Sequence, residues 1–259
     1  MQRSALLITL SVWKALFLRE ALTRLFGARG AWFWLLAEPV FQVTIMMFFF
    51  AVIRMRHVGG MDVMVWLMLG FLAFFMFSRT SAQTSNALSA NKALFAYRQV
   101  KPVDPVLVRG VLEGFLLVLV CSLLTSGMAL AGKMAVPSEP LRIIGAVVGL
   151  WVLGLGWGLM LSVCSDLLPE LARLIRLLTI PLMIVSGVIF PISALVQPYR
   201  DWLLLNPIAH GIEEVRAAYS ASYYAVPELD ISYMFFFSLV LVFLGLALHA
   251  RYEDRLIAA

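Results

Sequence analysis

Ionisable side chains interrupt the apolar stretches of this sequence at several points. Glu38 lies within one such stretch, and Arg79 lies at the polar end of the next. An ionised group at membrane depth is energetically costly, so it usually faces protein or a water-filled path. Two interpretations of Glu38 follow: it is a pathway or hinge residue, or it is a carboxylate at the inner interface that pairs with Arg29 or Arg24.

Glu113, in a third apolar stretch, follows Arg109 by four residues. Side chains at this spacing are neighbours on a helix, so we expect an ion pair between them.

The motifs of soluble enzymes are missing from the sequence. His57, His210 and His249 are scattered, and no glycine-rich phosphate loop or paired metal-ligand motif occurs. The sequence therefore predicts no catalytic site, no metal site and no cofactor bound by this chain.

One acidic pair leaves room for a different chemistry. Asp166 and Glu170 are spaced to share a helix face, as a membrane-embedded transferase acting on a lipid-linked substrate would require. Arg173 and Arg176 follow directly, and charges at helical spacing pair with one another. We therefore favour a salt-bridged helix end over a catalytic pair.

The composition is typical of a chain that spans a membrane. Of its 259 residues, 62% are hydrophobic and 14% are charged, and the mean hydropathy is +0.93. Soluble domains carry roughly 45–50% apolar and about 25% charged residues, so one soluble core could not hide this surface. The net charge of +5 is distributed between the apolar runs, which gives no reason to expect nucleic acid as a partner.

Six apolar segments reach the length of about 20 residues that a spanning helix needs. They cover residues 32–53, 63–82, 105–131, 141–164, 174–196 and 232–250. Residues 1–30 carry apolar side chains on one helical face and basic ones elsewhere, which predicts an amphipathic helix in the membrane interface. The predicted fold is all-α, a single polytopic domain over residues 1–259 with an interfacial helix at 1–30 and a six-span bundle at 31–250.

The distribution of basic residues predicts the orientation. An even number of spans puts both termini on one side, and more Lys and Arg residues fall on that side than on the other. Basic residues favour the cytoplasm, so we expect both termini there. The basic segment 79–104 is then cytoplasmic and contains a short predicted helix at 91–100. The outer segment 197–231 is too apolar for an ordinary loop, which predicts two short helices dipping into the outer leaflet.

Aromatic side chains gather near the predicted span ends. They either form the aromatic belts of the two membrane interfaces or line a conduit in which rings stack on the faces of sugars. The candidates for such a path, besides Glu38 and Arg79, are Trp13, Trp32, Trp34, Tyr97, Tyr199 and Trp202. Within the fourth span, Gly154, Gly156 and Gly158 indicate close helix packing.

Two stretches give the sequence a family resemblance. Residues 33–39 (FWLLAEP) open the first span, and residues 206–216 (NPIAHGIEEVR) precede the last one. With the basic amphipathic start, the six spans and the long cytoplasmic segment, the chain resembles the permease subunits of ABC-2-type exporters. It is most similar to the capsular polysaccharide export permeases of Gram-negative bacteria, and the resemblance covers essentially the whole chain.

This resemblance implies a function and a set of partners. The chain would be a multi-pass protein of the Gram-negative inner membrane, surrounded by lipid and paired with a second copy of itself. A separate ABC ATPase subunit would bind ATP and Mg on the cytoplasmic face. A lipid-linked acidic polysaccharide would be the cargo, and a periplasmic co-polymerase and an outer-membrane channel would receive it.

The resemblance also implies roles for particular residues. A coupling helix received by the ATPase would be formed by Asn91, Lys92, Leu94, Phe95, Tyr97 and Arg98. A second cytoplasmic contact would be made by Asp166, Glu170 and Arg173. Re-entrant helices would close the exit with Asn206, Pro207, His210, Glu213 and Arg216.

Other functions stay open at this level. Exporters of O-antigen, teichoic acid, lipids or drugs share the architecture, and the sequence does not choose between these cargoes. The embedded transferase described above is a second class. A scaffold that transports nothing is a third, which the lack of any predicted soluble domain disfavours.

Overall fold

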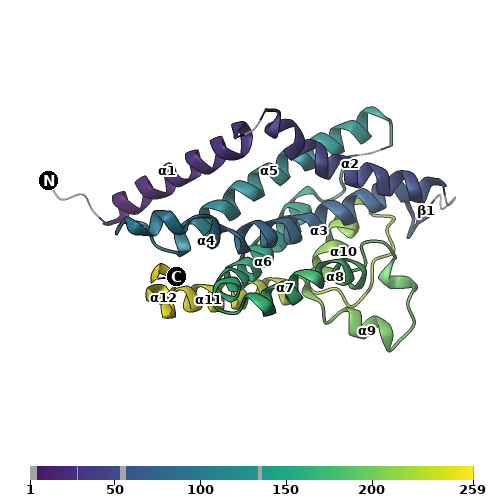
Figure 1. The fold of residues 1–259 in the computed structure, drawn as a ribbon. Coiled ribbons are helices and arrows are strands. Elements are labelled where there is room, and N and C mark those ends of the chain that lie inside the picture. The colour runs from purple at the N-terminus through teal and green to yellow at the C-terminus, as the bar shows by residue number, and fades with distance from the viewer. Residues whose placement is uncertain (1–4, 28, 53–56, 134–135, 259) are drawn as a thin grey trace.

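The computed structural model describes residues 5–27, 29–52, 57–133 and 136–258, and almost all of its elements are helices (Figure 1). The long helices are α1 (Ala5–Phe26), α2 (Ala31–Val52), α3 (Val63–Ser85), α5 (Val103–Leu130), α6 (Pro140–Leu167) and α11 (Ile231–Arg251). The shorter ones are α4 (Ala87–Ala90), η1 (Lys92–Ala96), α7 (Pro169–Leu177), α8 (Thr179–Val185), η2 (Ile192–Ala194), α9 (Tyr199–Leu203), α10 (Pro207–Tyr219) and α12 (Glu253–Ala258). The all-α prediction is confirmed.

A small hairpin is the one element of another kind among the described residues. Strand β1 (His57–Val58) pairs antiparallel with β2 (Met61–Asp62). Gly59 and Gly60 form the turn with φ of 58° and 89°, which is the left-handed backbone that a two-residue hairpin turn needs and that glycine adopts without steric cost. This hairpin was not expected from the sequence.

Helix α3 lies at the centre of the bundle. In its most apolar stretch 83% of the residues are buried, against 17% for α2 and 22% for α11. Helix α3 contacts α6, α5, α10 and α2, while α11 packs along α6. Because the outer helices expose large apolar side chains such as Phe41, Phe48 and Phe243, their outer faces suit lipid as the surrounding solvent.

The predicted close packing of the glycine-rich helix is confirmed. A Cβ at Gly154 would lie 2.5 Å from the carbonyl oxygen of Phe77 on α3, and one at Gly156 would lie 2.8 Å from the backbone nitrogen of Val242 on α11. The glycines of α6 therefore let α3 and α11 approach on opposite sides. Small residues at helix interfaces have this effect in membrane bundles.

Five of the six predicted spans correspond to single helices. Among the described residues, α2, α3, α5, α6 and α11 are long and apolar enough to cross a membrane, and their bounds fall within a few residues of those predicted. The first thirty residues contain the predicted helix as α1, which packs against α5 and α2. Its residues Leu7, Leu10 and Leu22 are more than half exposed, as an interfacial helix requires.

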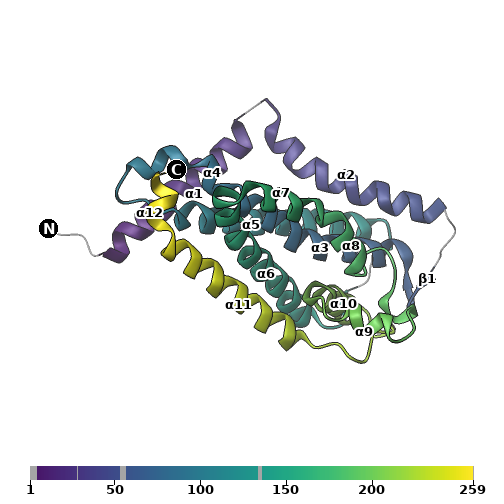
Figure 2. The same ribbon diagram turned by 60° about the horizontal axis from the view of Figure 1, so that its bottom comes forward.

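The fifth predicted span, 174–196, is wrong as a single helix. The chain forms α7, turns at Leu178 and continues as α8, which ends at Val185. Pro181 explains the break, because its ring conflicts with the carbonyl of Leu177 four residues earlier. Gly187, with φ of 73°, then ends α8 in the left-handed conformation that favours glycine. Together α7 and α8 lead from the end of α6 towards α9 (Figure 2).

The two ends of the molecule separate the predicted inner and outer segments. The start of α1, together with α4 and α12, lies at one end, whereas the hairpin and α9 lie at the other (Figures 1 and 2). The start of the first described helix and the last described helix therefore share an end. The predicted short helices of the outer segment are present as α9 and α10, and α10 packs against α6, α3 and α11.

Candidate functional site

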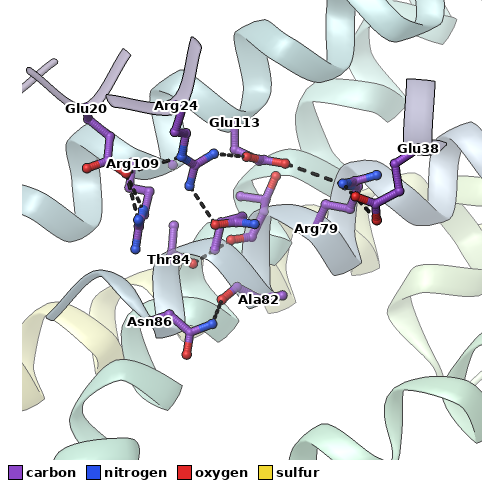
Figure 3. Close-up of polar contacts among 12 residues, drawn as sticks. Glu20, Arg24, Glu38, Arg79, Ala82, Thr84, Asn86, Arg109 and Glu113 are labelled. Carbon is purple, nitrogen blue, oxygen red and sulfur yellow. Dashed lines mark hydrogen bonds and ion pairs between the residues drawn. The ribbon is translucent and has the colours of Figure 1, made fainter. Parts of the chain in front are cut away.

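The largest group of ion pairs in the described chain joins α1, α2, α3 and α5 (Figure 3). This charged cluster consists of Glu20, Arg24, Glu38, Arg79, Arg109 and Glu113. Acidic and basic members alternate along the line of contacts, so each charge has an opposite neighbour. The cluster thereby fastens α1 to the bundle and continues to the surface of α2.

The inner part of the charged cluster is largely buried. Arg24 Nη1 lies 2.6 Å from Glu113 Oε2, and its Nη2 donates a hydrogen bond of 2.6 Å to Gln83 Oε1. Glu20 Oε1 lies 2.7 Å from Arg109 Nη2. The Glu113 side chain is only 6% exposed and that of Arg24 12%. At such burial an unpaired charge costs several kcal/mol, so these contacts hold α1, α3 and α5 in one arrangement.

The predicted pairing of Glu113 with Arg109 is wrong. Arg109 contacts Glu20 on α1, and Glu113 contacts Arg24. Because α1 folds back against α5, it supplies partners 89 positions earlier in the sequence. Helical spacing identifies partners on the same helix, and it does not detect partners brought in by tertiary packing.

Glu38 pairs with neither Arg29 nor Arg24, and that expectation is also wrong. Its Oε1 lies 3.5 Å from Arg79 Nη2 on α3, and the Glu38 side chain is 68% exposed. Arg79 Nε also lies 3.7 Å from Glu113 Oε1. Arg79 is therefore the link between the buried part of the charged cluster and the open surface beside α2.

An open groove of about 550 Å³ lies at this surface, between α2, α3 and α8. Its polar lining is Glu38, Gln42, Ser78, Arg79, Gln83 and Thr179, and its apolar lining includes Met46, Phe74, Phe75, Ile180 and Met183. Carboxylate, guanidinium, amide and hydroxyl groups can donate and accept hydrogen bonds to hydroxylated ligands. Ile180, Met46 and Met183 offer aliphatic surface to the apolar faces of such ligands, whereas Phe74 and Phe75 are only 2% and 5% exposed. We call this the polar groove.

Two further hollows lie around α8, and one of them adjoins the polar groove. One of about 380 Å³ shares Ser78, Ala82 and Thr179 with it. Another of about 350 Å³ is lined by α3, α6, α10 and α11 and meets the second hollow at Phe77 and Trp157. None of the residues of α8 is buried. Helix α8 therefore stands between open spaces that extend towards α9.

The predicted path residues are only partly brought together. Glu38 and Arg79 line the polar groove, and Trp202 lines the third hollow. Outside these linings lie Trp13, Trp32, Trp34, Tyr97 and Tyr199. Trp13 Nε1 instead donates a 2.8 Å hydrogen bond to Asp104 Oδ1. The Tyr199 ring makes an edge contact with the ring of Trp202, with 5.6 Å between the ring centroids.

The predicted helix at 91–100 is shorter and of another type. It is the 3-10 helix η1, which follows α4 and ends at Ala96. We call residues 87–98 the docking segment. Tyr97 and Arg98 are exposed there and Leu94 is partly buried, whereas Asn91 and Phe95 are only 5% and 6% exposed. Asn91 and Phe95 therefore fix the segment to the fold, and the predicted contact of the six residues with an ATPase stays a prediction.

The docking segment is linked to the second predicted cytoplasmic contact. Lys92 Nζ lies 2.6 Å from Asp166 Oδ1 near the end of α6. Glu170 pairs with Arg173 at 3.0 Å on the exposed face of α7. The expected salt-bridged helix end is thus present for Glu170. The Asp166 carboxylate is held by Lys92, and the described residues hold no group of three His, Cys, Asp or Glu side chains that could bind a metal.

The residues of the predicted outer gate include a fully buried ion pair. Arg216 Nη1 lies 2.8 Å from Glu213 Oε1, and neither side chain is exposed. The guanidinium also donates hydrogen bonds to the carbonyls of Gly187 and Val188, at 2.8 and 2.9 Å, and lies over the ring of Trp66 at 3.6 Å. These contacts fasten the segment after α8 to α3 and α10.

Tyr223 and Trp66 complete this buried network. The Tyr223 hydroxyl donates to Glu213 Oε2 at 2.8 Å, and Trp66 Nε1 donates to the Tyr223 oxygen at 3.3 Å. Burial, and then the charge of Glu213, raise the pKa of the Tyr223 phenol. Both carboxylate oxygens of Glu213 and the hydroxyl of Tyr223 therefore have hydrogen-bond partners. Buried polar and charged groups in proteins are normally paired in this way.

The other predicted gate residues hold the start of α10. Asn206 caps the helix by accepting from the Ile208 N–H at 3.0 Å, and Pro207 occupies the first turn. His210 Nε2 donates to the Leu204 carbonyl at 2.7 Å, while its Nδ1 accepts from the Asp230 N–H at 3.1 Å. These two bonds assign a neutral ring to His210. Asn206, Pro207, His210, Glu213 and Arg216 thus form a packed corner, which we call the outer corner, and their role in closing an exit stays a prediction.

Several residues of these networks were missed from the sequence. Glu20 lies on an amphipathic helix with many charges, and nothing in its spacing distinguishes it. Gln83 is one of several polar residues at the end of an apolar stretch, and Trp66 and Tyr223 look like ordinary interfacial aromatics. One signal was usable: an arginine in an apolar outer segment needs a partner, and Glu213 stands three residues before Arg216.

Comparison with known proteins relates this geometry to a family. Residues 11–220 match the ABC-2 type transporter family. The polysialic acid transport protein KpsM of Escherichia coli is 32% identical over 259 residues, which are 100% of each chain. The capsule polysaccharide export inner-membrane protein CtrC of Neisseria meningitidis serogroup A is 26% identical over 252 residues, covering 96% of this chain and 94% of CtrC.

A third relative extends the same similarity. The capsule polysaccharide export inner-membrane protein BexB of Haemophilus influenzae is 23% identical over 246 residues, covering 95% of this chain and 92% of BexB. The similarity runs through every element that carries the charged cluster, the polar groove and the outer corner. The chain belongs to the ABC-2 type transporter family.

Proposed function

We propose that this chain is the permease of a Gram-negative capsule exporter, which moves a lipid-linked acidic polysaccharide across the inner membrane. The observation that carries the proposal is the full-length similarity to KpsM, named for the transport of polysialic acid, an acidic polymer. The relatives CtrC and BexB are named as inner-membrane proteins of capsule polysaccharide export. The chain itself is a transporter subunit and not an enzyme.

The polar groove supports a polysaccharide cargo. Arg79 can pair with an acidic group of the polymer, while Gln42 and Gln83 offer amides to its hydroxyls. Met46, Ile180 and Met183 supply apolar surface in the same wall. A polymer needs a continuous passage, and the three adjoining hollows around α8 offer one along the side of a single protomer.

A second copy of the chain would close this passage. An open groove on one protomer becomes a channel only when another surface covers it, and a two-fold axis brings identical surfaces together. The exposed α8 and the weakly buried α2 flank the groove. In the proposal both copies contribute their polar grooves to one channel at the homodimer interface.

The energy would come from a partner. Permeases of capsule export in this family work with an ATPase, and this sequence contains no phosphate-binding loop. ATP and Mg would therefore be bound by that subunit. The docking segment and the Glu170–Arg173 face of α7 would form its contact surface, with Tyr97 and Arg98 as the exposed side chains.

The remaining parts of the proposal concern orientation and the periplasm. The end that holds α4 and α12 faces the cytoplasm, so both termini lie there, and the hairpin and α9 face the periplasm. A co-polymerase and an outer-membrane channel would receive the polymer at that outer end. The outer corner around Arg216 and His210 would support the exit rather than form its moving part.

Purification from membranes of the native host tests the proposal. We expect the wild-type chain to carry a P-loop ATPase at equal stoichiometry, and Arg98→Glu to lose it while keeping its yield and monodispersity. Lys133→Glu is the matched control, because this residue is a half-exposed cation at the opposite end and should retain the ATPase. A strain lacking the gene should accumulate polysaccharide inside the cell. Recovery without any ATPase in several mild detergents, or a deletion that leaves surface polymer unchanged, would overturn the proposal.

A further inference from the structure

Helix α12 lies directly against the docking segment. It contacts η1, and its Leu256 side chain is fully buried at 0% exposure. The neighbouring Ile257 on the same helix is 46% exposed. A helix of six residues is too short to be stable by its own hydrogen bonds, so the burial of Leu256 is what holds α12 in place.

The surroundings of Leu256 belong to the docking segment and its supports. Leu256 shares one apolar cluster with Phe95 of η1 and Leu88 of α4. Val106 of α5 and Leu159 of α6 complete the far side of this cluster. Leu256 therefore joins the apolar side of the docking segment to the transmembrane helices, and deleting it would leave Phe95 without part of its packing.

The polar side of the docking segment is fastened separately. Lys92 pairs with Asp166 at 2.6 Å. Asn91 Nδ2 donates to the Ala87 carbonyl at 2.8 Å, and its Oδ1 accepts from Arg19 of α1. The segment is thus held by α1 and α6 through polar contacts and by α12 through an apolar one. These supports come from distant parts of the chain and meet at one element.

We propose that α12 is a positioning element for the ATPase contact, and that Leu256 sets the docking segment in the conformation that the ATPase receives. The inference rests on the proposed function, since it assumes that residues 87–98 meet the ATPase. Leu256 itself does not touch the partner in this arrangement. It acts through Phe95, whose packing orients the exposed Tyr97 and Arg98 at the end of η1.

Hydrogen exchange of the purified permease, with and without its ATPase, tests the packing directly. The amides of Asn91, Leu94 and Tyr97 are hydrogen-bonded within the docking segment and report on its local opening. We expect Leu256→Asp to raise their exchange at least about tenfold, with α5 and α6 unchanged. Ile257→Asp, the matched control on the exposed side of α12, should exchange like the wild type.

Retention of the ATPase is the second measurement. Leu256→Asp should lose most of the co-purified ATPase, while Ile257→Asp should retain it. If exchange in the α5 and α6 peptides also rises in Leu256→Asp, then Leu256→Ala replaces it, and the same selective opening of the docking segment is required. Wild-type exchange in the docking segment of either fully folded variant would overturn the inference.

Arg98→Glu separates failure of the inference from failure of the proposed function. If it loses the ATPase and Leu256→Asp retains it, the docking assignment holds and the positioning role of α12 is wrong. A second outcome is that both variants retain the ATPase, while Leu256→Asp still accelerates exchange in the docking segment. Leu256 then packs the docking segment within this chain, as inferred. In that case the docking segment is not the contact, and the proposed positioning of the ATPase contact falls with it.

Discussion

Replacing Arg216 by methionine is the most informative perturbation of the outer corner. The wild-type guanidinium is fully buried and contacts Glu213, the carbonyls of Gly187 and Val188, and the ring of Trp66. Methionine fills much of the same volume but provides no hydrogen-bond donor. The substitution therefore leaves one buried carboxylate and three carbonyls, those of Trp66, Gly187 and Val188, without the cation that satisfies them.

The size of the effect follows from these contacts. Breaking a buried ion pair by removing one partner costs about 3–5 kcal/mol, because the other charge stays buried. Tyr223 still donates to Glu213 and keeps the cost within this range. For a chain of this length 1 kcal/mol corresponds to roughly 2–4 °C in Tm. We expect Arg216→Met to lower the Tm by about 10 °C in a fluorescence-detected thermal unfolding assay in detergent.

A double-mutant cycle makes the reasoning refutable. Glu213→Gln alone should also destabilise the chain, because it leaves the Arg216 cation buried without its counter-charge. Combining both substitutions removes the two charges together. The loss in free energy of unfolding of the double variant should therefore be smaller than the sum of the two single losses by about 2 kcal/mol or more. Additive losses would refute the claim that these side chains act as a buried pair.

Three smaller perturbations have defined outcomes. Glu113→Gln should lower the free energy of unfolding by about 2 kcal/mol, less than for a fully buried pair because Arg24 keeps other partners; equal Tm values in parallel melts would contradict this. Gly70→Ala should lower the Tm in the same melts, since its Cβ would meet the buried guanidinium of Arg216. Gly145→Ala, which has open space around it, should leave the Tm unchanged. The raised pKa of Tyr223 means that its stabilising contribution is complete below about pH 10 and declines above it. Between pH 9 and 11 the Tm of the wild type should therefore fall more than the Tm of Tyr223→Phe. Parallel plots of Tm against pH would argue against a buried phenol.

The sequence predicted the long helices well because each one depends on local composition. Runs of about 20 apolar residues give the bounds of α2, α3, α5, α6 and α11 within a few positions. The close packing of α6 also followed from local spacing, since glycines at 154, 156 and 158 can serve only an approach of neighbouring backbones. These features need no knowledge of which helices meet.

Features that depend on tertiary contact were not predictable in the same way. Arg24 reaches Glu113 because α1 folds back along α5, and hydropathy contains no information on that fold. Phe95 is buried in one apolar cluster with Leu256 of α12, and nothing in the sequence of its basic segment indicates that α12 packs there. The break at Leu178 was predictable in principle from Pro181. The prediction of a single span used the mean hydropathy of residues 174–196, which one proline hardly changes.

The distribution of buried charge shows which elements can move. Helix α3 is fixed near both ends, by Trp66 in the outer corner and by Arg79 and Gln83 in the charged cluster, roughly 20 Å apart along its axis. Any widening of the polar groove must therefore come from α2 or α8, since α8 has no buried residue. Among the described residues, the ion pair between α2 and α3 is that of Arg79 with Glu38, at 3.5 Å. Exposed pairs of this kind contribute only about 0–1 kcal/mol, so this ion pair can open while the buried part of the charged cluster behind it stays intact.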